Sequence, residues 1–434
     1  MIQLNYPKGN KLDRVITLPG SKYLANRLLI LAALSETGSS LSNMPHNEDI
    51  DTAINGLSEL GAKFEWQDNR LDCQGFKANQ AYNADQIYSS HSGSFSRFVM
   101  PVLALSEKTI SLSGSGKMNT RPMAELFSVL EQMGASLVSE HQSPPATLPV
   151  SVTGPIAGGT VEMSGSTSSQ FISALLMAGG KLPEGLTINL TAEPVSKPYL
   201  QMTIDLLALF GIQVVTDKQL RKFIIHPNQH YLGIDYQLES DPSSASYFLA
   251  AAAISGGHIC ISNFYPERSI QGEAQFATVL ELMGCKIWQN ETGFHCQGTK
   301  QLKAIKVDMG DMPDVVQTLA VVAMFATGKT VINNIANLAY KESNRIEDTA
   351  TEIRKTGVQV ETTQDALVIY GGTLSEQHKI AILDTHDDHR MAMSLALIAI
   401  KVPELQIRDP EVVAKSFPDY WQYLQQLGYS VAHA

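Results

Sequence analysis

The segment 341–360 (KESNRIEDTATEIRKTGVQV) contains the pattern of apolar and polar positions that organises this chain. Ile346, Ala350 and Ile353 stand at positions i, i+4 and i+7, with polar and charged residues between them. This spacing predicts an amphipathic helix with one apolar face. Gly357 supplies the left-handed backbone conformation that often ends a helix, and the residues after it predict a strand.

The same ending, a helix that stops at glycine before a strand, occurs six times. The six glycines are separated by 71 to 77 residues, which is hard to obtain by chance. This period is too long for a solenoid repeat, so we expect a larger unit with two helices and several strands. The copies are Leu57–Phe64, Leu130–Leu137, Leu207–Val214, Leu280–Ile287, Ile353–Val360 and Leu424–Val431.

The fourth unit gives the clearest order of elements. We expect a helix over Pro242–Ser255 with Asp241 as its cap, then a strand, a second helix and a hairpin. The later elements are predicted at His258–Phe264, Gly272–Met283, Lys286–Gln289 and Gly293–Gln297. A repeated βαβαββ-type unit favours the α/β class with mixed sheets. Six units divide most simply into two domains of three, with a break near residues 233–240 and ligand between the domains.

Composition narrows the class of function. The 434 residues are 44% hydrophobic and 17% charged, and no apolar run approaches the length of about 18–20 residues that spans a membrane. The net charge is −11, and no run of Lys and Arg suggests nucleic-acid binding. The four cysteines show neither CxxC nor Cys/His ligand spacing, which favours reduced thiols in a cytoplasm and no zinc site. The N-terminus lacks a signal or transit pattern.

Eight cations stand at predicted helix starts or just before them. Each one alone fits a solvated helix start, but helix N-termini also attract anions. If the repeated units are related by pseudo-symmetry, equivalent positions face a common place and form one anion-binding cleft. We expect a small ligand with phosphate and carboxylate groups. The cations are Lys22, Arg27, Arg97, Arg121, Lys341, Arg345, Arg390 and Lys415.

Hydroxyl-rich turns precede several of these helices. Backbone N–H groups around Gly93 are suited to cradle a phosphate, and the hydroxyls before Phe171 suit phosphate oxygens. Simple N-capping explains such turns equally well. Asp314 is either a helix cap or a base, and His389, in Asp387–Arg390, has either a structural or a chemical role.

Taken together, these residues resemble the enolpyruvyl transferases over essentially the whole chain. The resemblance implies two inside-out α/β domains of three units each that close on substrate. Residues 1–18 would form a strand of the C-terminal half, 19–234 the first domain and 235–434 the second. The segments that carry it are Leu18–Leu34, Ser168–Ala178, Ser196–Met202, Asp241–Ile254, Met312–Ala326, Lys341–Arg345, Asp388–Met393 and Lys415–Tyr420.

The resemblance is strongest to family members that act on shikimate 3-phosphate. It implies transfer of the enolpyruvyl group of phosphoenolpyruvate to the 5-hydroxyl of that acceptor, in the shikimate pathway to chorismate and the aromatic amino acids. It also implies a cytoplasmic monomer, inhibition by glyphosate, no metal or organic cofactor, and no nucleic-acid or membrane partner.

The resemblance also implies roles for individual residues. Asp314, with Lys341 close by, would be the base, and Glu342, aided by Lys22, would be the acid; His389 joins this catalytic set. The implied shikimate-phosphate site is Lys22, Tyr23, Arg27, Ser168, Ser169, Gln170, Ser196, Tyr199, Asp314, Asn337 and Lys341. The implied phosphoenolpyruvate site is Lys22, Gly93, Arg121, Gln170, Arg345, Arg390 and Lys415.

Four departures from the family pattern keep two alternatives open. Tyr23 stands where the family has serine, His91 begins an altered turn, Phe98 replaces proline and Ala339 replaces a basic residue. They leave open an enolpyruvyl transferase for another acceptor, or a catalytically silent anion-binding paralogue. The peptidoglycan branch is disfavoured because it generally carries a reactive cysteine near the position of Arg121, whereas the only cysteine in the first domain of this chain is Cys73.

Overall fold

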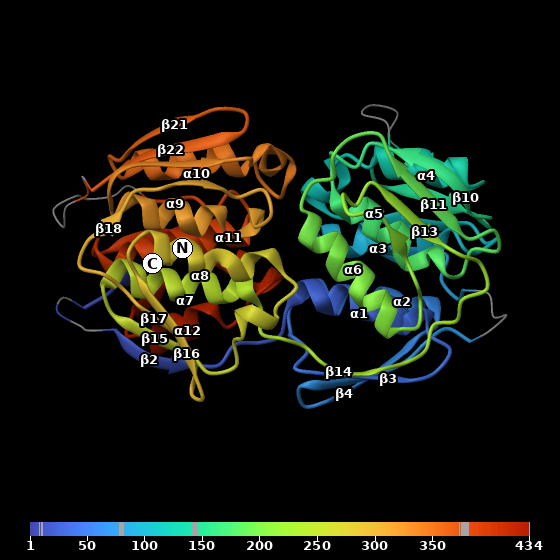
Figure 1. Ribbon diagram of the computed structural model, residues 1–434, viewed down its shortest axis with the longest axis horizontal. Coiled ribbons are helices and arrows are strands. Elements are labelled where there is room, and N and C mark those ends of the chain that lie inside the picture. Colours follow the sequence, from blue (N-terminus) through green and yellow to red (C-terminus); the bar gives the residue numbers. More distant parts are fainter. Residues whose placement is uncertain are drawn as a thin grey trace. The chain divides into compact units, whose positions relative to one another are not determined.

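The computed structural model describes residues 1–7, 9, 12–77, 82–140, 146–372, 374 and 382–433. The chain forms two compact units (Figure 1). One, the continuous unit, is Gly20–Leu238; the other, the discontinuous unit, combines Met1–Pro19 with Glu239–Ala434. The boundaries expected from sequence lie after residues 18 and 234, and those of the compact units lie after residues 19 and 238.

Each unit contains three small sheets, and five of these six described sheets share a common plan. In the sheet β6(Gln86–Tyr88)-β7(Ile110–Ser113)-β9(Val150–Thr153)-β8(Ser136–Ser139), the first pair is parallel and the next two pairs are antiparallel. Leu112, for example, pairs with Ile87 on one side and Val150 on the other. The mixed sheets predicted from the repeat are therefore present.

Four of the other described sheets follow this plan, whereas the three-stranded sheet around β1 has only antiparallel pairs. Those of the continuous unit are β14(Asp235–Gln237)-β3(Ser39–Ser42)-β5(Arg70–Gln74)-β4(Lys63–Gln67) and β10(Gly159–Met163)-β11(Leu186–Leu190)-β13(Lys222–Ile225)-β12(Val215–Thr216). Those of the discontinuous unit are β2(Asp13–Ile16)-β15(His258–Ile261)-β17(Gly293–Gln297)-β16(Lys286–Asn290), β18(Leu302–Lys303)-β20(Ala326–Asn333)-β22(Ala366–Gly371)-β21(Gln359–Thr362) with β19(Lys306–Asp308) also on β20, and β23(Leu405–Ile407)-β1(Ile2–Asn5)-β24(Ser430–His433).

Three strands complete sheets that lie far away in the sequence. β14 joins the first sheet of the continuous unit, where Tyr236 pairs with Leu41. β2 pairs in parallel with β15, and β1 lies between β23 and β24, so that Ile2 pairs with both Ile407 and His433. Both N-terminal strands therefore belong to the discontinuous unit.

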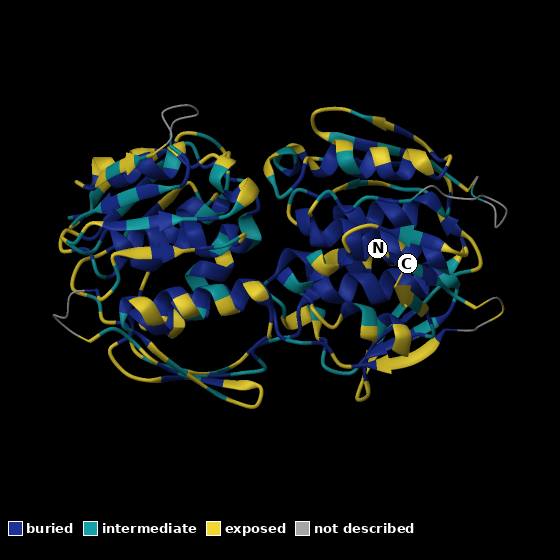
Figure 2. Cartoon of the chain, turned by 180° about the vertical axis from the view of Figure 1, so that it is seen from behind, coloured by how far each residue is buried: buried dark blue, intermediate teal, exposed yellow. Residues whose placement is uncertain are grey.

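Helices fill the interior of each unit, and the sheets lie outside them. The core helices are almost wholly buried, as Figure 2 shows, and this burial includes several of their polar and charged residues. They are α1(Lys22–Leu34), α3(Gly93–Leu103) and α5(Ser169–Gly179) in the continuous unit, and α7(Pro242–Ser255), α9(Val316–Met324) and α11(His389–Ala396) in the discontinuous unit. No helix in the described ranges is long and apolar enough to cross a bilayer.

The second helix of each repeat is amphipathic and keeps one face in solvent. These outer helices are α2(Glu48–Leu60), α4(Ala124–Gln132), α6(Lys197–Leu209), α8(Phe276–Leu282), α10(Arg345–Lys355) and α12(Tyr420–Gln426). The repeat glycines follow these helices, and all six have positive φ: 119° at Gly61, 103° at Gly134, 87° at Gly211, 104° at Gly284, 86° at Gly357 and 101° at Gly428. The helix stops predicted from the repeat are confirmed.

The predicted elements of the fourth unit are largely confirmed. α7 has the expected bounds, and Asp241 accepts a hydrogen bond from the backbone N–H of Ser243 at 2.8 Å. Strand β15 ends earlier than expected, at Ile261, since the Asn263 side chain takes up both backbone polar groups of Leu18. The second helix begins as a 3₁₀ turn over Gly272–Gln275.

Candidate active site

A dense charge cluster in the discontinuous unit surrounds Arg345, the first residue of α10. Its side chain is 2% exposed and donates hydrogen bonds to three carboxylates. Nε and Nη2 reach the two oxygens of Asp388 at 2.7 and 3.2 Å, Nη1 reaches Asp314 at 2.7 Å, and Nη2 reaches Glu342 at 2.9 Å. Burial alone would lower the pKa of Arg345, but Asp388, Glu342 and Asp314 together raise it. The guanidinium is thus a fixed cation.

Local sequence explains why the carboxylates meet there. Asp388 caps α11 by accepting a hydrogen bond from the backbone N–H of Arg390 at 2.9 Å. Asp314 lies in the 3₁₀ turn Pro313–Val315, directly before α9. Glu342 lies three residues before Arg345, at the start of α10. Helix starts thus place all three acids.

Three further cations complete this cluster. Lys341 Nζ lies 3.6 Å from Asp314, Arg390 Nη2 lies 3.5 Å from the other oxygen of Asp314, and Lys415 Nζ donates to Glu342 at 3.0 Å. The four cations and three carboxylates (Asp314, Glu342 and Asp388) leave one net positive charge. Such a cluster can take up an anion.

Arg390 and His389 occupy the first turn of α11. Arg390 Nη1 donates to the hydroxyl of Tyr247, in α7, at 3.1 Å. Burial raises the pKa of Tyr247 to about 12, with Arg390 opposing the rise. The ring of His389 is 1% exposed, and its Nδ1 lies 3.7 Å from Asp388. His389 therefore lies beside the carboxylate that holds Arg345.

The helix starts of the continuous unit are built differently. Serine caps all three core helices: Ser21 accepts from Leu24 N–H, Ser92 from Phe95 N–H and Ser168 from Gln170 N–H, at 3.3 to 3.4 Å. None of these three described helices has an acidic residue in its first turn. The positive ends of their dipoles are therefore not neutralised locally, which suits anion binding.

Lys22, the first residue of α1, has a carboxylate partner from another helix. Its Nζ lies 2.8 Å from Asp49, and both side chains are buried, with exposures of 7% and 5%. Asp49 is in the first turn of α2, whose cap is Asn47. Sequence reasoning did not single out Asp49, because acids in a first turn are common.

The sequence had suggested that Arg27 lies at the start of a helix. In the structure it lies about one and a half turns inside α1. It donates to Thr203 Oγ1 at 2.8 Å, and to the backbone oxygens of Tyr23 and Tyr199 at 3.0 and 3.3 Å. Its guanidinium carbon lies 5.1 Å from the ring centroid of Phe98. Burial lowers the pKa of Arg27 to about 10. Helix packing thus encloses this cation.

Tyr23 packs against another residue of the predicted acceptor site. Its ring centroid lies 5.0 Å from that of Tyr199, and Lys22 Nζ lies 5.8 Å from the Tyr23 ring. Only 9% of Tyr23 is exposed. Of the other departures, His91 is exposed before α3, and Ala339 is half-buried in the 3₁₀ turn Ala336–Tyr340, which also contains Asn337.

Gly93 is in direct contact with Arg121. A Cβ atom on Gly93 would lie 2.2 Å from Arg121 Nη1, so that a larger residue would require the guanidinium to move. Arg121 is 8% exposed, and its Nε has no hydrogen-bond partner among the described residues. Phosphate or carboxylate is the group that such a guanidinium binds best.

Gln170 links two further parts of this unit. It accepts a hydrogen bond from Arg97 and donates to Ser94 Oγ at 3.0 Å. Arg97 is the fifth residue of α3, so it too lies inside a helix. Ser169 opens α5, and Ser196 adopts a left-handed conformation just before α6.

Most of the predicted residues gather in three groups, whereas Ser168, Ser169, Ser196 and Asn337 are located only by their positions at helix starts and in a 3₁₀ turn. The discontinuous unit brings together Asp314, Lys341, Glu342, Arg345, His389, Arg390 and Lys415. The continuous unit has one group around Lys22, Tyr23, Arg27 and Tyr199, and another around Gly93, Arg97, Arg121 and Gln170. The single cleft expected from sequence stays a prediction.

Sequence reasoning assigned no role to three residues of these groups. Asp388, Asp49 and Tyr247 each bind a predicted site cation. Asp388 lies within the segment 387–390, which the sequence analysis had named. Its position directly before a predicted helix was the signal that could have identified it as a cap. Among the described residues, no group of three or more His, Cys, Asp or Glu side chains is arranged to hold a metal ion.

Comparison with known proteins identifies the family. The family model for EPSP synthase (3-phosphoshikimate 1-carboxyvinyltransferase) matches residues 7–424. This chain therefore belongs to the EPSP synthase family. Proteins named 3-phosphoshikimate 1-carboxyvinyltransferase are similar along almost their whole length. That of Aliivibrio salmonicida is 37% identical over 426 residues, covering 96% of this chain and 97% of the relative. That of Photobacterium profundum is 38% identical over 425 residues, with the same coverage.

Solved structures agree with this assignment. An EPSP synthase from Acinetobacter baumannii superposes with a TM-score of 0.82 at 25% identity, and the match covers 100% of both chains. The inside-out α/β fold described above is thus the fold of that enzyme.

Proposed function

We propose that this protein transfers the enolpyruvyl group of phosphoenolpyruvate to the 5-hydroxyl of shikimate 3-phosphate and releases phosphate. The observation that carries this function is the cluster around Arg345, in a chain that matches the EPSP synthase family over residues 7–424. Phosphate and carboxylate groups on both substrates match the fixed cations of the site.

The acceptor is bound by hydroxyl, amide and cationic side chains. Serine caps and N–H groups at the start of α5 suit the 3-phosphate, and Arg27 with Tyr23 suits the carboxylate. The acceptor set is Lys22, Tyr23, Arg27, Ser168, Ser169, Gln170, Ser196, Tyr199, Asp314, Asn337 and Lys341. Phosphoenolpyruvate is bound by Lys22, Gly93, Arg121, Gln170, Arg345, Arg390 and Lys415, which supply mainly positive charge.

Asp314 and Glu342 make the proton transfers. Asp314 removes the proton of the 5-hydroxyl, and Glu342 gives a proton to the methylene carbon of phosphoenolpyruvate. The acceptor oxygen bonds to the central carbon, and a tetrahedral intermediate forms. Loss of phosphate and of a proton from the methyl group then restores the enol ether. The fixed cations stabilise the departing phosphate.

The ion pairs of the cluster suggest how substrate binding would activate Asp314 and Glu342. Arg345, Lys341 and Arg390 surround Asp314, and Arg345 with Lys415 holds Glu342. Both acids therefore engage cations that the substrate anions also need. We propose that the bound anions replace these carboxylates as partners of the cations. This exchange frees Asp314 and Glu342 for proton transfer only when substrate is present.

Three further properties belong to this proposal. The protein acts as a monomer in the cytoplasm on small-molecule substrates. Glyphosate competes with phosphoenolpyruvate, because its carboxylate and phosphonate match the cations, Arg121 among them, that are proposed to bind phosphoenolpyruvate.

Phosphate release tests the reaction directly. Purified protein is mixed with phosphoenolpyruvate and shikimate 3-phosphate, and free phosphate is followed continuously. We expect release that requires both substrates and is inhibited by glyphosate. Absence of release while phosphoenolpyruvate still binds would contradict the acceptor assignment and direct attention to Tyr23. Absence of both release and binding would contradict the proposal as a whole.

A further inference from the structure

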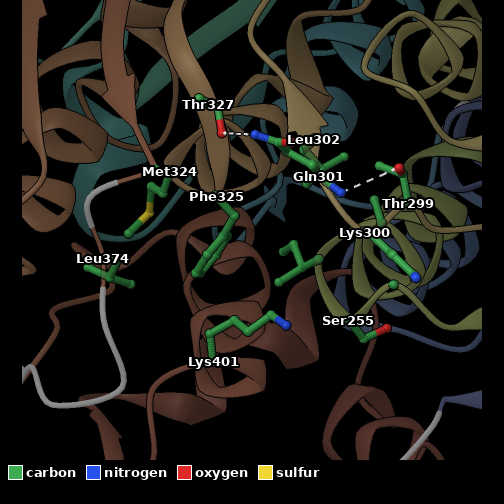
Figure 3. Close-up of a pocket in the computed structure, with 14 residues that line it drawn as sticks. Ser255, Thr299, Lys300, Gln301, Leu302, Met324, Phe325, Thr327, Leu374 and Lys401 are labelled. Atoms are coloured by element: carbon green, nitrogen blue, oxygen red, sulfur yellow. Dashed lines mark hydrogen bonds between the residues drawn. The ribbon is translucent and has the colours of Figure 1, made fainter.

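The discontinuous unit contains a concave region that is lined by none of the residues of the Arg345 cluster. It is a cavity of about 420 Å³ at the C-terminal ends of the core helices (Figure 3). Ser255 is the last residue of α7, Met324 is the last residue of α9, and Lys401 follows the 3₁₀ turn Leu397–Ile400 that continues α11. This volume falls within the range of small-molecule pockets.

The cavity is separate from the proposed active site. α7 has 14 residues and is therefore about 21 Å long. The cluster residues Asp314 and Arg390 belong to the N-terminal ends of the same bundle of helices. A ligand in the cavity therefore does not touch those residues.

The lining combines an apolar wall with a cationic rim. Ile254, Leu302 and Met324 are at least 96% buried and form the wall together with Phe325 and Leu374. The rim contains Lys300, Lys401, Ser255, Thr299 and Gln301, and none of the described lining residues is acidic. In Figure 3 the Lys401 side chain extends across the cavity toward the side where Ser255 and Lys300 lie.

Gln301 fixes part of this rim. Its Nε2 donates to Thr327 Oγ1 at 3.1 Å, and its backbone N–H donates to Thr299 Oγ1 at 3.4 Å. These bonds position the short loop between β17 and β18 that carries Lys300.

From this lining we propose that the cavity binds a small monocarboxylate with a compact apolar body. The carboxylate lies between the ammonium groups of Lys401 and Lys300, and the body lies against Leu302, Met324 and Phe325. The three helix ends contribute partial negative charge of about half a unit each, about one and a half units in all, and the two lysine charges exceed it by about half a unit. The inference does not depend on the proposed reaction.

Benzoate is the probe for this site, with acetate and benzamide as matched controls. Binding to the full chain is measured by calorimetry or ligand-observed NMR in the presence of saturating phosphoenolpyruvate, which occupies the other anion site. We expect benzoate to bind with a Kd on the order of 1 mM. Acetate lacks the body and benzamide lacks the charge, so each should bind about tenfold more weakly.

Two lysine variants locate the binding. Lys401→Gln should weaken benzoate binding about tenfold, since it removes one charged partner of the carboxylate. Lys303→Gln is the control, because Lys303 follows Leu302 in β18 without lining the cavity. No saturable benzoate binding, equal binding of benzamide, or an unchanged Kd in Lys401→Gln would overturn the proposal. In the last case Lys401 would serve only to offset the helix ends, and its loss would lower stability alone.

Discussion

The two units of this protein share one architecture but differ at the starts of their core helices. In the continuous unit, α1, α3 and α5 are capped by neutral serines. In the discontinuous unit, Asp241, Asp314 and Asp388 stand at the starts of α7, α9 and α11. Serine leaves the positive helix end available to a ligand, whereas aspartate neutralises it and can hold a cation. The same fold therefore provides helix starts that suit anion binding in one unit and helix starts that can bind arginine side chains in the other.

The first prediction, with the largest effect, concerns the acids of the discontinuous unit. Asp314→Ala and Glu342→Ala should each lower kcat by about a thousandfold or more, since each removes a proton-transfer group. The measurement is phosphate release, with circular dichroism as the check on folding. Turnover near that of the wild type would remove these two residues from the mechanism. Conservative Asp314→Asn should lose as much activity as the alanine variant.

The second prediction separates a holding aspartate from a capping serine. Asp388→Ala leaves the buried Arg345 without its bidentate partner and should lower the free energy of unfolding by about 3–5 kcal/mol. Ser92→Ala in the continuous unit loses only a cap and should cost about 1 kcal/mol. Urea unfolding measures both. Equal losses in the free energy of unfolding would mean that Asp388 contributes no more to stability than a capping serine does.

The third prediction concerns Glu239, which lies just before α7 and forms no ion pair with a cation among the described residues. Burial, together with the charge of Asp241, raises the pKa of Glu239 from its ordinary 4.5 to about 7. The folded protein therefore holds this proton more tightly than the unfolded chain. The stability that Glu239 contributes is full below pH 4.5 and is lost as the pH rises through 7.

Glu239→Gln removes this dependence. The variant should be more stable than the wild type at pH 8, by about 3 kcal/mol at most, and the difference should shrink toward zero near pH 4.5. Unfolding midpoints at several pH values test this. A difference that does not change with pH would show that another group is responsible.

The fourth prediction converts one kind of helix start into the other. Ser168→Asp keeps a good cap for α5 and should leave stability almost unchanged. The new charge repels the acceptor phosphate, so the KM for shikimate 3-phosphate should rise about tenfold. Ser168→Asn is the matched control, because it caps without charge. If both variants raise KM equally, the charge of the cap is not what matters.

The smallest predicted effect is at Tyr23. Because its ring packs on Tyr199, Tyr23→Ser should change the KM for shikimate 3-phosphate by less than about threefold. Tyr23→Phe keeps the ring packing and isolates the hydroxyl. A tenfold fall in KM for the serine variant would instead indicate that the ring occupies the place of the acceptor carboxylate.

Features set by neighbouring residues were accessible from the sequence. The six glycine stops and the start of α7 depend on caps and φ angles a few residues apart, and the structure has them where expected. Three members of the Arg345 cluster, Lys341, Glu342 and Arg345, were also singled out because they lie close together in the chain, whereas Asp388 was not.

Features set by distant packing were not accessible in the same way. Lys22 pairs with Asp49, which is 27 residues away in the sequence, and Arg345 pairs with Asp388, which is 43 residues away. No local sequence pattern predicts either pair. Arg27 looks like a helix-start cation, yet Thr203 and Tyr199 from α6 enclose it. The partners of β14 and β1 likewise depend on which sheet edge is open in the folded unit.

The pairing of β1 and β2 with strands far away in the sequence has a consequence for synthesis on the ribosome. Every strand of the continuous unit comes from residues 39–237, so this unit can fold as soon as that segment has emerged. The strands β1 and β2 precede their partners β15, β23 and β24, which all follow residue 257. β2 can therefore pair only after β15 has been made and β1 only after β23 and β24, so the discontinuous unit closes after residues 430–433 have emerged.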